Sequence, residues 1–281
     1  MITEKVNQNL KNALTANFVF SGLSGIFLLI AGNQIKSEFG LDNNLLLTIV
    51  GGVLVIFSAQ LYVFRAHPTR QSLMGWYASI NDLGWVLGSI LVLALQPVNI
   101  SLMGNLIIIF VALLVLTFVI LQLNALAEET ITHELVRELS IPVEDLWPII
   151  SDVDGYSQYA TGLSSSKVIK GEGVGLVRRC YDLKKQGWNE ECIQWKEGRS
   201  YTMNVDTSDY PYPFKKFQGT WSVTPVDGTK SLISLKYDYV AKYGIIGQLL
   251  MRRMFGKVAD DTINDIIDAY AKKAEEIKVL A

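Results

Sequence analysis

The 281-residue sequence predicts a two-part protein: an all-α bundle of four membrane-spanning helices in residues 1–126, then a cytosolic α+β domain in residues 127–281. The distribution of charge is the first observation behind this prediction. Only six charged residues occur among the 114 positions from 13 to 126, whereas the 155 positions from 127 to 281 carry 43, an ordinary fraction for a soluble domain. The second observation is the apolar pattern. Four long apolar segments fill the first part, and strand-like alternation precedes one long amphipathic segment in the second.

The overall composition excludes several classes of protein. The chain is 50% hydrophobic and has a formal net charge of −2. Because the first part is so apolar, the chain is not expected to be a purely cytosolic protein, a disordered chain or a disulfide-stapled secreted domain. A nearly balanced charge without a basic run also gives no reason to expect a nucleic-acid partner.

Four apolar segments, residues 14–31, 45–64, 73–95 and 102–123, are predicted to span a membrane. A helix needs about 20 apolar residues to cross a hydrocarbon core roughly 30 Å thick. Backbone groups in lipid must also be satisfied within the segment, which favours helices. Four such segments in a row, with short polar breaks, argue against buried helices of a soluble protein. We expect the first to be an uncleaved span, because no small-x-small cleavage site follows it and three more spans do.

Lysine and arginine residues in the short loops predict the orientation. The N-terminal tail and the second loop lie on one side and carry Lys5, Lys11, Arg65 and Arg70, whereas the other side carries only Lys36. Because positive charge accumulates in cytoplasmic loops, both termini are expected in the cytoplasm. The expected location is the inner cell membrane, which the chain crosses four times.

Asp82 is the one ionisable residue well inside a predicted span. A charge at that depth is costly, so a functional role or a polar partner is expected. Asn81, Gln60 and Asn105 are the candidate partners. The alternative is that Asp82 is a neutral or paired packing residue. Small residues in the spans suit close helix contact, and one pair has the small-xxx-small spacing. These residues are Gly22, Gly25, Gly51, Gly52 and the pair Gly84 and Gly88.

The second part begins with an extended stretch, residues 132–141, and continues with a short helix. Pro142 suits a first helical position, with Glu144 and Asp145 in the first turn, and Pro148 limits the length of this helix. A second short helix or turn is expected in residues 152–161. Strand signals then dominate, separated by glycine-containing turns. The last element is a helix in residues 245–277, where Gly256 can mark a bend. The predicted strands are residues 166–170, 175–183, 190–197, 200–207, 216–226 and 231–241.

Several motifs in this order carry a resemblance to a known family. They are Ile141-Pro142-Val143-Glu144-Asp145-Leu146-Trp147, Gly171-x-Gly173-Val174-Gly175-x-x-Arg178-Arg179, Glu191-x-Ile193-x-Trp195 and Gly219-Thr220-Trp221-x-Val223-x-Pro225. With the terminal helix, residues 132–280 resemble the START/SRPBCC superfamily, near its polyketide-cyclase/dehydrase-like and coenzyme-Q-binding branch. The resemblance implies a helix-grip fold, in which a curved antiparallel sheet wraps the long helix and leaves a hydrophobic cavity. Pro148 departs from the family's usual first helix.

The first part resembles small four-span bacterial membrane proteins. The residues that carry this resemblance are Asn17-x-x-Phe20-Ser21-Gly22 and Asn81-Asp82-x-x-Trp85. It implies no activity.

Strand alternation predicts which side chains face a cavity. The mostly apolar face of each strand is assigned inward, and the face with Arg178 and Glu190 is assigned to solvent. A hairpin turn centred on Gln186 makes Arg179 and Glu191 diagonal neighbours on the inner face, within reach of an ion pair. The alternative is that the aromatic residues fill a core and this pair is structural. The predicted ligand-binding residues are Arg179, Tyr181, Glu191, Trp195, Tyr201, Trp221, Tyr237 and Tyr239.

The sequence offers no recognisable metal or nucleotide motif. The histidines His67 and His133 and the cysteines Cys180 and Cys192 have no zinc-ligand spacing, so neither a metal nor a cofactor is expected. The same hairpin register places the two cysteines opposite each other on the solvent face, where a reducing compartment leaves free thiols. The glycine-rich residues 171–175 lead into a strand rather than a helix, which indicates a turn.

These observations predict a membrane-anchored protein that binds a hydrophobic ligand, such as a lipid, a quinone or a polyketide-like molecule, in its cytosolic domain. One alternative is a cyclase or dehydratase that uses Glu191, Arg179 or a tyrosine as acid or base. Binding is favoured, because the predicted cavity face has no histidine and an arginine neighbour keeps Glu191 ionised. A second alternative is a transporter or sensor that acts through Asp82 with a regulatory soluble domain. The ligand's identity and the oligomeric state stay open.

Overall fold

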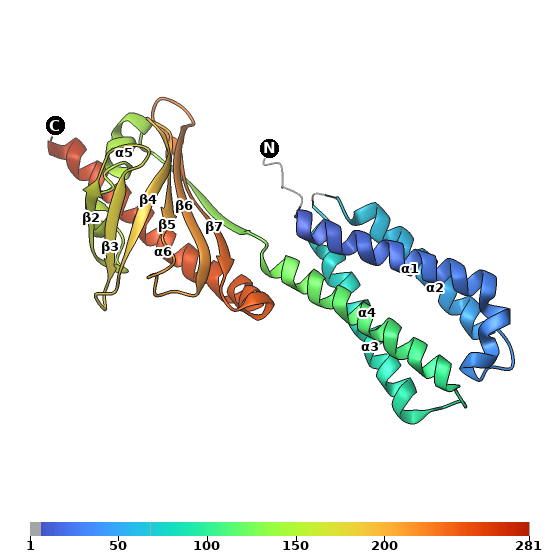
Figure 1. The fold of residues 1–281 in the computed structure, drawn as a ribbon. Helices are drawn as coiled ribbons and strands as arrows, with labels where there is room; N and C mark the ends of the chain where they lie inside the picture. Colours follow the sequence, from blue (N-terminus) through green and yellow to red (C-terminus); the bar gives the residue numbers. More distant parts are fainter. Residues whose placement is uncertain (1–6, 68, 281) are drawn as a thin grey trace. The chain divides into compact units, whose positions relative to one another are not determined.

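The computed structural model describes residues 7–67 and 69–280 (Figure 1). By its internal contacts the chain divides into two compact units, Met1–Glu129 and Thr130–Ala281.

The first unit consists of four long helices and one 3₁₀ turn. They are α1 (Gln8–Ile35), η1 (Lys36–Phe39), α2 (Leu45–Phe64), α3 (Gln71–Leu95) and α4 (Leu102–Ala127). All four long helices are apolar enough to cross a membrane, as the sequence predicts. Helix α1 starts earlier than predicted because Asn7 caps it, with the Asn7 Oδ1 atom accepting a hydrogen bond from the Leu10 backbone N–H at 3.1 Å.

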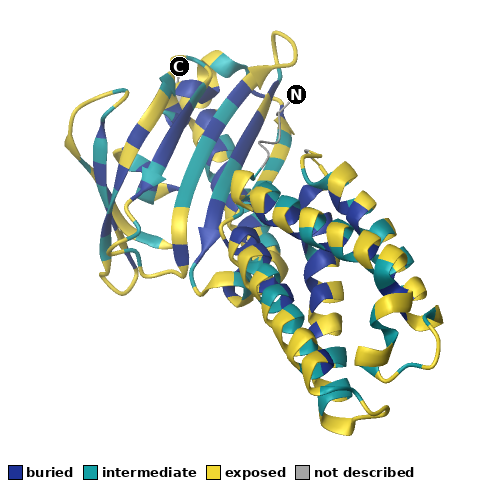
Figure 2. Cartoon of the chain, turned by 45° about the vertical axis from the view of Figure 1, so that its right-hand side comes forward, coloured by how far each residue is buried: buried dark blue, intermediate teal, exposed yellow. Residues whose placement is uncertain are grey.

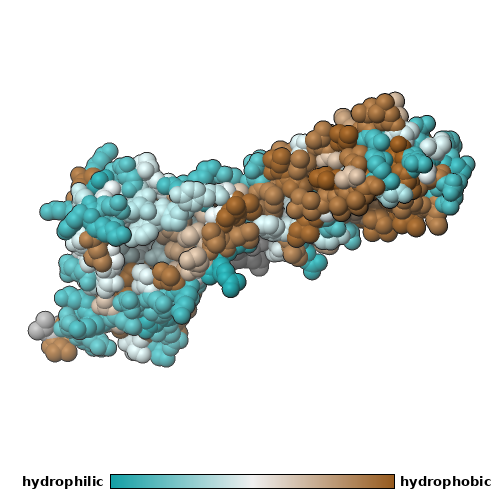
Figure 3. Space-filling model, turned by 90° about the horizontal axis from the view of Figure 1, so that it is seen from below, coloured by the Kyte–Doolittle hydropathy of each residue, from teal (hydrophilic) through white to brown (hydrophobic). Residues whose placement is uncertain are grey.

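Large apolar side chains cover the outside of these helices. Leu23 is 65% exposed and Leu102 is 78% exposed, and hydrophobic surface dominates this part of the chain in Figure 3. Soluble proteins rarely expose apolar patches of this extent. The surface is therefore suited to lipid, where helices can satisfy their own backbone groups.

Two of the predicted close glycine contacts join α1 to α2. A Cβ atom at Gly25 would lie 2.8 Å from the Gly51 carbonyl oxygen, and one at Gly22 would lie 2.7 Å from the Ser58 Oγ atom. The pair with the small-xxx-small spacing does not serve this purpose. Within the described residues, nothing lies within 4 Å of a Cβ atom built at Gly84 or Gly88, and the same is true of Gly52.

The second unit is a seven-stranded antiparallel sheet around one long helix, which is the predicted helix-grip fold (Figures 1 and 2). The strand order is β1-β7-β6-β5-β4-β3-β2. The strands are β1 (Ile131–Leu139), β2 (Leu163–Lys170), β3 (Val177–Asp182), β4 (Gly187–Lys196), β5 (Ser200–Val205), β6 (Phe214–Pro225) and β7 (Ser231–Ala241). The helices are α5 (Val143–Ile150), the 3₁₀ turn η2 (Gly155–Gln158) and α6 (Gly244–Leu280). Pro142 precedes α5 in an extended conformation, and Pro148 lies inside that helix.

The inner face of the sheet packs on the second half of α6. Ile263, Ile267 and Tyr270 of this helix have no exposed surface, and they share one core with Tyr201 and Ile233 of the sheet. The first half of α6 is less buried than the second, and residues of this first half line a cavity.

The predicted register of the β3–β4 hairpin is wrong. Arg178 pairs with Glu190 and Cys180 with Trp188, so the turn is centred two residues earlier than predicted. The cause is Asp182, whose Oδ1 atom accepts hydrogen bonds from the backbone N–H groups of Lys184 and Gln186. Cys192 lies opposite Met203 of β5, so the two cysteines do not face each other.

The predicted inner face is also wrong for β3 and the first half of β4. Arg178, Cys180 and Glu190 are buried, whereas Tyr181 and Glu191 are exposed. The prediction favoured the more apolar face, but at this edge of the sheet the inward face carries a compensated ion pair. A bulge after Cys192 reverses the alternation and turns Trp195 inward, where it packs on the core. The inner faces of β5, β6 and β7 are as predicted.

Replacing Gly25 by alanine is expected to lower the thermal stability of the helical unit. The new Cβ atom meets a backbone oxygen of α2, and overpacking of this kind costs about 1–3 kcal/mol. The matched control is Gly88→Ala, which has open space around the new atom and gains helix propensity of about 0.5–1 kcal/mol. Helical circular dichroism of the detergent-solubilised protein during heating measures both. Equal midpoints for the two variants would contradict the α1–α2 contact.

The two cysteines are expected to be unreactive in the folded protein. Burial raises the pKa of the Cys180 thiol to about 12 and also raises the pKa of Cys192. Because the thiolate is the reactive form, a raised pKa lowers its fraction at pH 8, and labelling should be at least about tenfold slower than after unfolding in urea. Titration with a chromogenic disulfide reagent measures both rates. Fast native labelling of either thiol would show that the hairpin is not packed as described.

Candidate functional site

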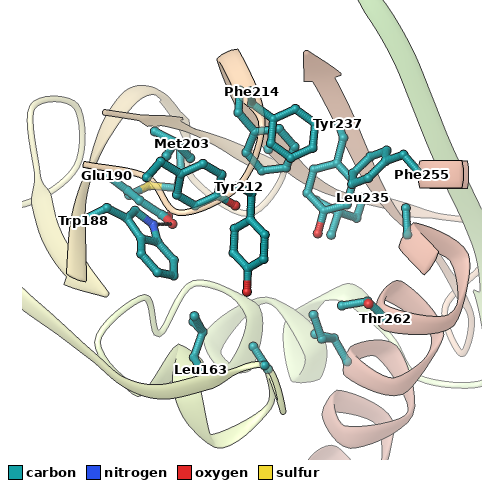
Figure 4. Close-up of a pocket in the computed structure, with 18 of the residues that line it drawn as sticks. Leu163, Trp188, Glu190, Met203, Tyr212, Phe214, Leu235, Tyr237, Phe255 and Thr262 are labelled. Carbon is teal, nitrogen blue, oxygen red and sulfur yellow. Dashed lines mark hydrogen bonds between the residues drawn. The ribbon is translucent and has the colours of Figure 1, made fainter. Parts of the chain in front are cut away.

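A cavity of about 360 Å³ lies between the inner face of the sheet and the first half of α6. This volume is within the range of small-molecule sites. Side chains from five strands, the η2–β2 segment and α6 line it (Figure 4). They include Leu163, Trp188, Glu190, Met203, Tyr212, Phe214, Leu235, Tyr237, Phe255 and Thr262.

One wall of the cavity is a continuous aromatic cluster. Phe214 and Phe217 of β6 stack with ring centroids 4.6 Å apart, and Phe217 stacks on Tyr237 of β7 at 5.1 Å. Phe255 of α6 meets Phe214 edge-on at 5.2 Å. Such contacts fix the rings in place, so the wall is largely preformed for an apolar ligand.

A buried ion pair forms the opposite, polar end. The Arg178 Nη2 and Nε atoms donate to the same Glu190 oxygen at 2.6 and 2.9 Å, and the Trp188 indole N–H donates to the other oxygen at 2.8 Å. The guanidinium also lies over the Tyr156 ring, 4.3 Å from its centroid. Arg178 is 4% exposed and Glu190 is 8% exposed. Burial acts to lower the pKa of Arg178, but Glu190, with smaller contributions from Cys180, Tyr201 and Tyr156, outweighs burial and leaves that pKa raised.

The tyrosines of the cavity are neutral hydrogen-bonding groups at physiological pH. Burial raises the pKa of Tyr156 to about 12 and holds those of Tyr210 and Tyr237 well above their ordinary value. The Tyr237 hydroxyl points across the cavity toward Thr262 (Figure 4). It makes no hydrogen bond within the described residues, so it can donate one to a ligand.

The cavity opens to the surface beside α6. Tyr212, which is 44% exposed, and Val258, which is 61% exposed, both line it. Apolar side chains continue from this mouth along the start of α6, where Ile246 is 67% exposed, to Tyr243 just before the helix, which is 80% exposed. An apolar molecule can therefore approach the cavity along an apolar surface.

The structure gathers only some of the predicted ligand-binding residues around the cavity. Trp221 and Tyr237 line it. Tyr201 and Trp195 stack on each other at 5.4 Å inside the core, and Tyr239 is buried behind the aromatic wall, 5.3 Å from Phe214.

The other three predicted residues lie on the outer face. Glu191 is exposed, and Arg179 donates to the Asn189 side chain at 3.1 Å and lies over the Tyr181 ring. Sequence reasoning therefore missed Arg178, Trp188 and Glu190. A signal in the sequence points to them. They are an even number of positions from Cys180 or Cys192, so they lie on the same face of the strands as these cysteines, and cysteine is among the most often buried residue types.

Asp82 of α3 is buried, but its partners differ from those predicted. The Asp82 Oδ2 atom accepts hydrogen bonds from Asn17 of α1 at 2.7 Å and from Gln122 of α4 at 3.1 Å. The three predicted partners bond elsewhere: Asn81 donates to the Tyr77 carbonyl, Gln60 accepts from the Tyr77 hydroxyl, and Asn105 accepts from Gln96. Among the described residues, no group of three His, Cys, Asp or Glu side chains is placed to hold a metal ion.

The second unit is similar in sequence to a known protein family and to several bacterial proteins. Residues 130–275 match the family model "Polyketide cyclase / dehydrase and lipid transport". The ribosome association toxin RatA of Escherichia coli is 23% identical over 163 residues, which cover 56% of this chain and 97% of the toxin. The Vibrio cholerae RatA is 22% identical over 142 residues, which cover 50% and 92%.

Solved structures with similarity to this chain include two enzymes. The Zhui aromatase/cyclase of Streptomyces sp. R1128 has 18% identity and a TM-score of 0.45, covering 52% of this chain and 94% of its own. Norcoclaurine synthase of Thalictrum flavum has 15% identity and a TM-score of 0.45, covering 54% and 91%.

Replacing Glu190 by glutamine is expected to destabilise the second unit by about 3 kcal/mol. The substitution leaves the Arg178 charge buried without a carboxylate, and breaking a buried pair in this way costs about 3–5 kcal/mol. The matched control is Glu191→Gln on the next, exposed position of the same strand, which should change stability by less than about 0.5 kcal/mol. Urea unfolding followed by tryptophan fluorescence compares them. Equal effects would mean that the pair does not organise the hairpin.

Proposed function

Because the chain belongs, through residues 130–275, to the polyketide cyclase/dehydrase and lipid transport family, we propose that it is a membrane-anchored protein that holds a hydrophobic molecule in the cavity of its second unit. The observation that carries this proposal is the cavity itself. It combines a rigid aromatic wall with a few polar groups, and this combination suits a largely apolar ligand that carries few polar groups.

The chemistry of the walls narrows the ligand class. Most of the lining is apolar. The free hydroxyl of Tyr237 offers a hydrogen bond to a carbonyl or hydroxyl group, and the Arg178–Glu190 pair adds polar atoms at the opposite end. A lipid, a quinone or a polyketide-like molecule has this character. The exposed apolar start of α6 would let such a molecule arrive from a membrane rather than from water.

The anchor in this proposal is the helical unit. Its four helices are long and apolar enough to span a bilayer, and the distribution of Lys5, Lys11, Arg65 and Arg70 favours cytoplasmic termini. The cavity would then lie on the cytoplasmic side of the inner membrane, where it can exchange its ligand with the bilayer or with a soluble partner.

The geometry favours binding over acid–base catalysis. Glu191 and Arg179, which the enzymatic alternative uses, lie on the outer face. Glu190 is in the cavity wall, but both of its oxygens accept hydrogen bonds. Two bonds from Arg178 and one from Trp188 hold this carboxylate in the wall, where it acts as a fixed polar group.

The names of the bacterial relatives describe ribosome association, which is a property of those proteins. The formal net charge of −2 does not favour binding of this chain to ribosomal RNA, because phosphate contacts supply most of such affinity.

Filling the mouth of the cavity is expected to reduce ligand binding by about tenfold, or about 1.4 kcal/mol. Val258→Trp adds bulk at an exposed lining position and should leave the core intact. The measurement is photolabelling of the full chain in phosphatidylcholine nanodiscs with a diazirine-bearing fatty acid, followed by peptide mapping. Wild-type label should fall on peptides of β5, β6 and the first half of α6.

The matched control is Ile277→Trp, an exposed position near the end of α6, which should label like the wild type. Label that is confined to α1–α4, or that Val258→Trp does not reduce, would reject the cavity as the binding site.

A further inference from the structure

The helical unit contains a second hollow, which the proposed function does not use. A groove of about 830 Å³ runs between the α1–α2 hairpin and the α3–α4 hairpin, and all four helices line it. Its walls are mostly apolar, with side chains such as Phe27, Val53, Trp85 and Val111. The polar residues Ser21, Ser24, Glu38, Gln60, Asn81 and Ser89 also line it. Asp82 also lines this groove, although it is only 5% exposed.

The hydrogen bonds around Asp82 leave one carboxyl oxygen free. The Ser21 hydroxyl donates to Asn17 Oδ1 at 2.9 Å, so the Asn17 amide N–H group is turned toward Asp82. The Ser79 hydroxyl donates to Gln122 Oε1 at 2.9 Å and turns that amide in the same way. Both amides donate to Asp82 Oδ2. Within the described residues, no group bonds to Asp82 Oδ1.

A second polar atom in the groove is also free. Ser24 lies one helical turn beyond Ser21 on α1 and lines the groove. Its hydroxyl makes no hydrogen bond among the residues that the structure describes. A buried polar atom in a membrane without a partner is costly, so the groove favours an occupant that supplies one polar group near Asp82.

The depth of Asp82 restricts that group. The residue is near the middle of α3 (Gln71–Leu95), far from both ends of the helix. A charged headgroup at this depth would lose its hydration, and an anionic headgroup would also meet a carboxyl group. A hydroxyl group is neutral, and it can donate to a carboxylate or accept from a carboxylic acid, so it satisfies Asp82 Oδ1 in either protonation state.

We propose that the groove between the two helical hairpins binds a membrane-soluble alcohol, with its alkyl or isoprenoid chain along the apolar walls and its hydroxyl group on Asp82 Oδ1. The residues of this site are separate from those of the cavity in the second unit. The site gives the membrane half a recognition role of its own beyond anchoring.

The test uses the full chain in phosphatidylcholine nanodiscs and a photoactivatable diazirine derivative of hexadecan-1-ol. Two unlabelled compounds are compared as competitors of this photolabel: hexadecan-1-ol, and heptadecane, which has the same number of heavy atoms and no hydroxyl group. For the wild type, the alcohol should compete at least about tenfold better than the alkane, the effect of one hydrogen bond to a buried carboxyl group. The label should map to peptides of α1–α4.

Asp82→Leu should abolish the preference for the alcohol, whereas Asn105→Leu, a polar residue outside the groove, should retain it. Val53→Trp narrows the groove from an exposed position without touching the hydrogen bonds of Asp82, and it should reduce labelling even if Asp82→Leu fails to fold. Equal competition by alcohol and alkane, or a preference that survives in Asp82→Leu, would overturn the site. Label that falls only on β5, β6 or α6 would also overturn the groove site, and it would support ligand binding in the cavity of the second unit.

Discussion

The ion pair between Arg178 and Glu190 holds together the edge of the sheet on which the cavity depends. It joins β3 to β4 in one register, and Trp188 and Tyr156 complete its surroundings with a hydrogen bond and a cation–π contact. Two charges at this degree of burial are tolerated only when each has close partners. The pair therefore stabilises the register that the turn at Asp182 sets, and it also provides a polar end of a largely apolar cavity.

A buried carboxyl group organises the helical unit as well, with one difference. Glu190 has hydrogen bonds on both oxygens, whereas the bonds around Asp82 converge on one oxygen and draw α1, α3 and α4 together. A carboxyl group with partners on both oxygens stabilises its surroundings, and one with a free oxygen beside a groove can also bind a ligand. Each unit thus contains a largely apolar hollow whose lining includes a buried carboxyl group.

Much of the architecture could be predicted because it depends on local periodicity. The four helices and all strands follow from apolar runs and alternation, and the inner faces of β5 to β7 follow from the positions of Tyr201, Trp221 and Tyr237. The candidate site could be predicted only in part. The alternation favours Arg179 and Glu191 over Arg178 and Glu190, because the neighbouring side chains on their face are more apolar. Polarity is a poor guide where buried charges compensate each other.

By itself, the sequence determined what short stretches of chain decide: which segments are long and apolar enough for lipid, which alternate as strands, and the helix-grip family of the second unit. Only the tertiary structure decided which face of β3 and of the first half of β4 points inward, because Arg178 and Glu190 compensate each other's charge across two strands. It also decided the partners of Asp82, which come from helices 65 and 40 residues away. Such contacts depend on how helices and strands meet in space, and residue type constrains that only weakly.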